Sequence, residues 1–90
     1  MKRAIITVVG KDTVGIIAKV CTSLAKENVN ILDISQTIVS GYFNMMMIVD
    51  ITERDADFVK LAHKVESLGT EIGVVIKMQR EDIFNSMHRI

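Results

Sequence analysis

The chain has 90 residues, enough for one domain and too few for two, because a single core typically occupies roughly 100 residues. Hydrophobic residues make up 49% and charged residues 24%, which predicts a packed globular domain, and eleven basic and eleven acidic side chains cancel. This balance gives no argument for nucleic acid or a membrane surface as partner, and the single cysteine excludes an internal disulfide, so we expect a cytoplasmic protein that binds a neutral or zwitterionic partner.

The first predicted elements are a strand and a helix. Residues 3–9 are mostly β-branched and almost continuously apolar, which is typical of a central strand. After a break at 10–13, apolar residues return at helical spacing and predict an amphipathic helix over about 13–28. We expect Asp12 to be its N-cap and Asn28 to lie at its C-terminal end.

A β-hairpin follows this helix. Residues 30–39 alternate in polarity, with one face formed by Leu32, Ile34 and Ile38. Ser40-Gly41 is the two-residue connection of a tight hairpin, in which glycine supplies a positive φ angle. The next strand, over 42–51, has one wholly apolar face, which is made of Phe43, Met45, Met47, Val49 and Ile51.

The remaining segments predict a second helix, a fourth strand and a C-terminal helix. Thr52 and Asp55 form a variant capping box for a helix over about 54–68 that ends at Gly69. A strand then alternates through Ile72, Val74, Ile76 and Met78. Apolar positions in the last ten residues indicate a short helix that includes Ile83, Phe84 and Met87.

This order predicts an α+β fold, the ferredoxin-like βαββαβ sandwich, with two helices on one face of a four-stranded antiparallel sheet. Two helices do not cover both faces, so we expect the C-terminal helix, another subunit or, as we prefer, a combination of the two to cover the second one. The side chains predicted to share that open face are Ile5, Thr7, Val9, Val39, Tyr42, Met46, Ile48 and Val75. Fold alone does not identify function, because RNA binders, metal carriers, acylphosphatases and effector domains share this architecture.

The candidate binding site is the loop between the first strand and the first helix. It comprises Gly10, Lys11, Asp12, Thr13, Val14, Gly15 and Ile16. Glycines let another molecule approach the backbone, and free amides at a helix start attract a carboxylate. With the carboxylate and hydroxyl of Asp12 and Thr13, such a loop can hold both ends of a zwitterion. The alternative, a capped helix whose glycine is small for packing, stays open.

The pattern Gly10-x-Asp12-x-x-Gly15-Ile16, followed after a helix by Asn28-Val29-Asn30-Ile31, resembles the ACT domain family over residues 3–79. The segments Ile34-Ser35-Gln36-Thr37, Phe43-x-Met45-Met46 and Ile83-Phe84-x-x-Met87 are similar to the small single-ACT-domain proteins of bacteria and archaea. The resemblance implies a regulatory domain over residues 1–80 and a C-terminal helical extension over 81–90.

The resemblance also implies an assembly and a site. Two copies would pair side by side through the second strand and the first helix, giving an eight-stranded sheet with effector sites at the seam. Asp12 would contact the amino group of the effector, Gly15 would permit its close approach, and Asn30 and Ile31 would come from the partner chain. Because several amino-acid-binding relatives carry asparagine where this chain has Asp12, the identity of the ligand stays open.

We therefore expect a stand-alone ACT-type regulatory module that binds an amino acid or similar small metabolite as a homodimer or higher homo-oligomer, with no catalysis, cofactor or metal. No dinucleotide or P-loop fingerprint, catalytic triad or C-x-x-C pair occurs in the sequence. An acylphosphatase needs an arginine in the first loop, where Asp12 would repel phosphate, and RNA-binding platform aromatics are missing. A second hypothesis is a protein-interaction module whose degenerate site serves only dimerisation, and whose open sheet face docks a client metabolic enzyme.

Overall fold

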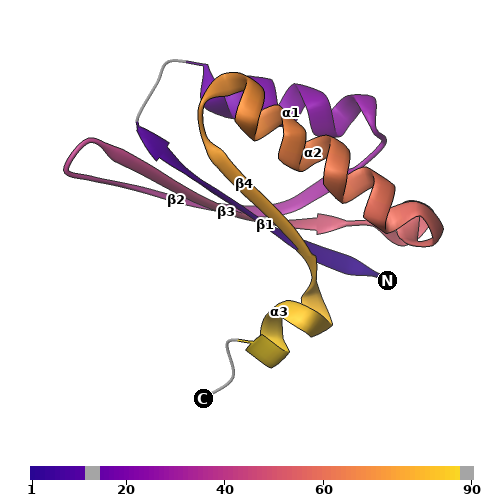
Figure 1. The fold of residues 1–90 in the computed structure, drawn as a ribbon. Coiled ribbons are helices and arrows are strands. Elements are labelled where there is room, and N and C mark those ends of the chain that lie inside the picture. Colours follow the sequence, from indigo (N-terminus) through magenta and orange to yellow (C-terminus); the bar gives the residue numbers. More distant parts are fainter. Residues whose placement is uncertain (12–14, 88–90) are drawn as a thin grey trace.

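The computed structural model describes residues 1–11 and 15–87 (Figure 1). In chain order the elements are β1 (Arg3–Lys11), α1 (Ile16–Lys26), β2 (Asn30–Val39), β3 (Tyr42–Asp50), the 3-10 helix η1 (Thr52–Asp57), α2 (Phe58–Ile72), β4 (Val75–Arg80) and α3 (Glu81–Met87). The strands form one antiparallel sheet in the order β2-β3-β1-β4. This arrangement confirms the ferredoxin-like prediction. Among the described residues, no helix is long and apolar enough to cross a membrane.

The core lies between the sheet and the pair of helices α1 and α2, which share one face of the sheet (Figure 1). The predicted apolar face of β3 is confirmed, because none of its inward side chains, nor Ile51 just after the strand, is more than 3% exposed. From α1 the core receives Ile16, Val20 and Leu24, and from α2 it receives Phe58, Leu61, Ala62 and Val65. Burying each large aliphatic or aromatic side chain contributes about 1.5–3 kcal/mol, so this layer is the main source of stability.

The predicted end of the second helix at Gly69 is wrong. α2 continues to Ile72, a residue that we had predicted to begin the last strand, and Gly73 ends the helix with a φ of +82°. Gly69 is buried where α2 packs on β4, and a Cβ atom there would lie 2.8 Å from both Ile76 Cγ1 and the Val74 carbonyl oxygen. Glycine at this position therefore permits close helix-to-strand packing.

The predicted capping box of Thr52 and Asp55 is also wrong. The η1 helix starts at Thr52 without a side-chain cap, and Asp55 pairs instead with Arg80, at 3.2 Å from Nε. Asp50 stabilises this turn instead, because its Oδ1 accepts hydrogen bonds from the Thr52 amide at 2.9 Å and from the Thr52 hydroxyl at 2.5 Å. The aspartate that precedes the threonine, rather than the one that follows it, fixes the chain after β3.

Strand β2 has the predicted bounds, and the turn that follows it has the predicted geometry. Ser40 and Gly41 have φ angles of 51° and 81°, as a two-residue hairpin turn with two left-handed residues requires. The strand also contains an irregularity that the sequence did not indicate, because the register with β3 shifts between Ile31 and Asp33. The extra residue, Leu32, breaks the predicted alternation and brings Ile31 to the same face as Ile34.

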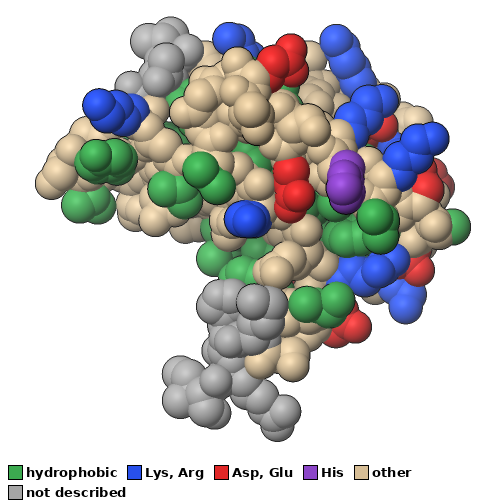
Figure 2. All heavy atoms as spheres, viewed as in Figure 1, with side chains coloured by type: hydrophobic (Ala, Val, Ile, Leu, Met, Phe, Trp, Pro, Cys, Tyr) green, Lys and Arg blue, Asp and Glu red, His purple; other side chains and the backbone are tan. Residues whose placement is uncertain are grey.

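The second face of the sheet is partly covered. Helix α3 contacts β1 and β4 on the side opposite α1 and α2 (Figure 1). At this end of the face Ile5 is only 6% exposed, whereas Val9 and Val75, two rows away, are 44% and 59% exposed. The rest of the open face includes the exposed side chains of Val39, Tyr42 and Met46. Figure 2 shows hydrophobic side chains below the sheet, whereas lysines and arginines gather over α2 and its N-terminal end.

Candidate functional site

The two halves of the predicted site lie at opposite ends of the sheet. Lys11 pairs with Tyr42 at one end, and Asn30 pairs with Asp50 at the other, where Arg3 of β1 also pairs. These ends are separated by the length of β1, nine residues or about 27 Å at 3.4 Å per residue. A single chain therefore does not bring Asn30 to the loop that follows β1.

The loop residues themselves have different environments. Gly10 packs against the start of β4, where a Cβ atom would lie 2.6 Å from Val74 Cγ1, so its small size serves packing. Asp12, Thr13 and Val14 lie outside the described residues. The N-cap position of α1 is Gly15, with a φ of +91°, rather than the predicted Asp12, and no side chain of the described residues caps it. Ile16 is 4% exposed and belongs to the core.

At the other end of the sheet lies the N-terminal part of β2, the strand that forms one edge of the sheet. Asn30 is exposed, and Ile31 is half-buried opposite Val49. The edge formed by β4 differs, because α2 packs over that strand and Glu66 accepts the Met78 amide at 2.8 Å. On β2, by contrast, the Ile34 amide donates a hydrogen bond to the exposed carboxylate of the neighbouring Asp33 at 2.9 Å. The large apolar side chains exposed along this edge strand are Leu32, Ile34, Ile38 and Val39.

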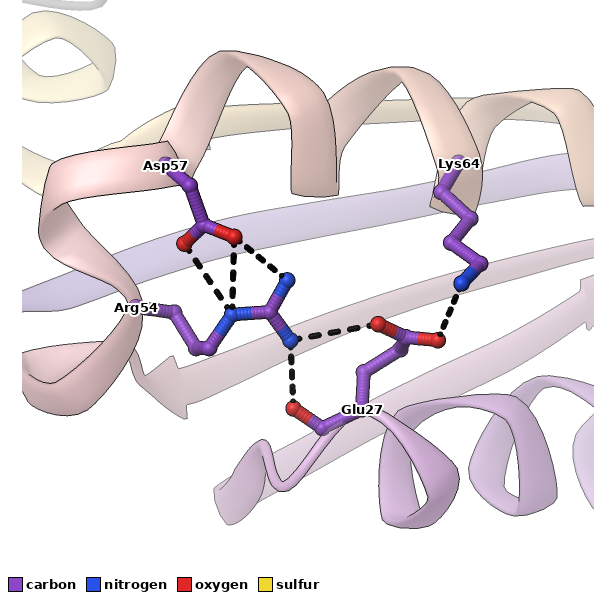
Figure 3. A network of polar contacts seen from close by, with 4 residues as sticks. All are labelled: Glu27, Arg54, Asp57 and Lys64. Atoms are coloured by element: carbon purple, nitrogen blue, oxygen red, sulfur yellow. Dashed lines mark hydrogen bonds and ion pairs between the residues drawn. The ribbon is translucent and has the colours of Figure 1, made fainter.

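A network of polar contacts fixes the connection that leads from α1 into β2 (Figure 3). Arg54 of η1 donates to the Glu27 carbonyl at 2.7 Å and to the Glu27 carboxylate at 3.1 Å, and its other side contacts Asp57 at 2.9 Å. Lys64 of α2 lies 2.9 Å from the second Glu27 oxygen. Hydrogen bonds from Lys64 and Arg54 lower the pKa of Glu27, and Arg54 lowers the pKa of Asp57. The network positions the segment from Asn28 to Asn30.

Beside this network lies a hollow of about 740 Å³ that sequence reasoning did not predict. It is bounded by the end of α1, the connection into β2, the end of β3 and the start of η1. Its polar lining consists of Asn28, Asn30, Asp50, Thr52 and Glu53. Among these residues only Asn30 belongs to the predicted site. The others come from segments more than twenty positions apart, and no local pattern in the sequence brings them together.

The fold is that of a small α+β domain in which β2 is an edge strand of the sheet. A sequence model of the ACT domain matches residues 2–79, and the chain belongs to this family. ACT domains are typically regulatory, commonly bind amino acids and commonly dimerise.

Relatives confirm the narrower resemblance to single-domain proteins of bacteria and archaea. The chain is 64% identical to a UPF0237 protein of Bifidobacterium longum and 48% identical to one of Methanocaldococcus jannaschii, in each case over 90 residues and the whole of both chains. The solved structure of an ACT domain protein from Streptococcus pneumoniae is 44% identical, with a TM-score of 0.82 over 92% of this chain and 93% of that one.

Proposed function

We propose that the chain is a regulatory module that binds an amino acid or a similar small metabolite at the interface of a homodimer, and that it catalyses no reaction. The observation that carries this proposal is the uncovered edge of β2, where Leu32, Ile34 and Ile38 are 43%, 41% and 59% exposed. An edge strand of ten residues with exposed apolar side chains is a template for pairing with another chain. The opposite edge strand, β4, is shorter, with six residues, and it packs against α2.

Antiparallel pairing of two β2 strands about a two-fold axis would reconcile the separated halves of the site. It reverses the direction of the partner, so Asn30 and Ile31 of one protomer approach the end of the sheet where β1 of the other protomer reaches Lys11. The described ends of the loop, Gly10 with Lys11 and Gly15, would then lie toward the start of the partner's β2. Each ligand would contact both chains, and the dimer would hold two equivalent sites.

Within this proposed site the residues have separate roles. Within residues 1–11 and 15–87 no side chain caps the first amides of α1, which suit a carboxylate, and Gly15 would let the ligand approach them closely. Asp12 would pair with the amino group, and Thr13 would add a hydroxyl. The remaining residues of the proposed site would support the loop without bonding to the ligand; these are Gly10, Val14 and Ile16.

The proposal is tested by thermal unfolding of the purified protein against a panel of amino acids and related metabolites. A ligand at one hundred times its Kd stabilises by about 2.7 kcal/mol, so we expect the Tm to rise by about 10 °C or more. Asp12→Ala and Asn30→Ala should remove the rise, whereas Asn85→Ala, at an exposed position on α3, should retain it. A well-folded dimer whose Tm responds to no compound would contradict the proposal.

One observation favours the second function, a protein-interaction module that docks a client metabolic enzyme. The open sheet face remains apolar beyond the reach of α3, where Val39, Tyr42 and Val75 are 64%, 55% and 59% exposed. A folded dimer without any ligand response would support this alternative, because dimerisation through β2 leaves the open face free.

A further inference from the structure

The hollow beside Asn30 has both an apolar and a polar wall. Val29, which is 5% exposed, and Ala25 line it from the side of α1, and the carboxamides of Asn28 and Asn30 stand at the connection into β2. Neither carboxamide makes a hydrogen bond within the described part of the chain. Each therefore offers an unused oxygen and an unused amino group at the rim.

The charge of the hollow is negative. Asp50 and Glu53 line it, and no lysine or arginine side chain is among its described lining residues. Met1 also lines the hollow, and its amino group contributes least to lowering the pKa of Asp50. One ammonium does not neutralise two carboxylates, so the hollow favours a cationic group over an anion or a neutral amide.

Asp50 is held in place for such a contact. Oδ1 accepts the Thr52 amide and hydroxyl, and these two bonds lower the pKa of Asp50, which keeps it charged at neutral pH. Oδ2 has no hydrogen-bond partner within residues 1–11 and 15–87. A fixed carboxylate with one unused oxygen loses little conformational freedom when a donor binds it.

We propose that this hollow binds a primary ammonium group on a short aliphatic chain. Asp50 is the counter-ion, the Asn28 and Asn30 oxygens accept the remaining N–H groups, and Val29 contacts the methylenes. In residues 1–11 and 15–87 no group of three or more His, Cys, Asp or Glu is placed to hold a metal ion. Asn30 also belongs to the proposed effector site. If the ammonium group is part of the effector's side chain, the inference therefore rests on the proposed function. The same chemistry also fits a separate amine.

The test is calorimetric titration of the full chain with lysine and with norleucine, which has the same aliphatic chain without the side-chain ammonium. We expect lysine to bind at least about tenfold more tightly, as one charge-assisted hydrogen bond allows. Asp50→Asn keeps an oxygen for Thr52 but removes the charge, and should abolish the difference. Asp82→Asn is the matched control, since Asp82 also bonds a neighbouring amide but lies outside the hollow. If Asp50→Asn fails to fold, Glu53→Gln, at an exposed position, should reduce the difference.

A parallel arm follows the Asp50 and Thr52 amide resonances by NMR during titration with 1-aminobutane. Shifts there without binding of lysine or norleucine would support a separate amine in the hollow, even if the effector proposal failed. Equal affinity for lysine and norleucine, with no shifts on adding 1-aminobutane, would overturn the ammonium site and leave the effector proposal intact. An unchanged preference for lysine in both Asp50→Asn and Glu53→Gln would also overturn it.

Discussion

Replacing Ile38 with aspartate is expected to convert a homodimer of twice 10.1 kDa into monomers. Ile38 lies on β2 opposite Phe43, and its side chain is 59% exposed on the edge that we propose to pair. Each dimer would then bury two carboxylates in an apolar contact, which should weaken association by at least about 100-fold, or roughly 2.7 kcal/mol. Light scattering coupled to size-exclusion chromatography measures the mass directly.

Val75→Asp is the matched control for this substitution. Val75 is also 59% exposed and also lies on an edge strand, but it belongs to the open face of β4. We expect the Val75→Asp protein to remain dimeric. A dimer that survives Ile38→Asp and dissociates with Val75→Asp would show that the sheet faces, rather than the β2 edges, form the interface.

Gly69→Ala is expected to lower the free energy of unfolding by about 1–3 kcal/mol, although alanine is intrinsically favoured over glycine within a helix by about 1 kcal/mol. The added Cβ would stand 2.8 Å from Ile76 Cγ1 and 2.8 Å from the Val74 carbonyl oxygen. The second of these is a backbone atom, so a rotamer change does not relieve the contact. α2 would have to move away from β4.

Chemical denaturation followed by circular dichroism measures this loss. Ser67→Ala, at an exposed position two residues earlier on the same helix, should leave stability within about 0.5 kcal/mol of the parent chain. A stabilised Gly69→Ala protein would mean that helix propensity decides at this position and that the packing of α2 on β4 is loose.

Where side-chain periodicity is strong, the sequence was sufficient to predict the fold. The alternation from Phe43 to Val49 has one interpretation, and the structure buries that face. Gly69 was ambiguous in the sequence, because glycine suits both the end of a helix and a point where a helix packs closely on a strand. Only the position of β4 decides between the two. The register shift beside Leu32 was not predictable either, since an irregularity in an edge strand leaves the local polarity pattern unchanged.

The site was less predictable than the fold. The helix-start loop and Asn30 follow from local residue chemistry and from family resemblance, but their separation by the length of β1 depends on strand order. Arg54 and Glu27 are 27 positions apart, and their hydrogen bonds require η1 to lie against the end of α1. Asp50 was only one of several polar residues in the sequence. The role that we propose for it in the hollow depends on Thr52 and on the distant connection at Asn28.

A mixing experiment tests most directly whether the site is shared between two chains. Asp12→Ala and Asn30→Ala proteins are titrated separately and after subunit exchange, with the amino acid that gives the largest Tm shift. In a mixed dimer one site carries both changes and the other carries neither, so each protein alone should not bind, whereas the mixture should recover about one quarter of all sites. A mixture that remains unable to bind, although exchange has occurred, would contradict the shared site.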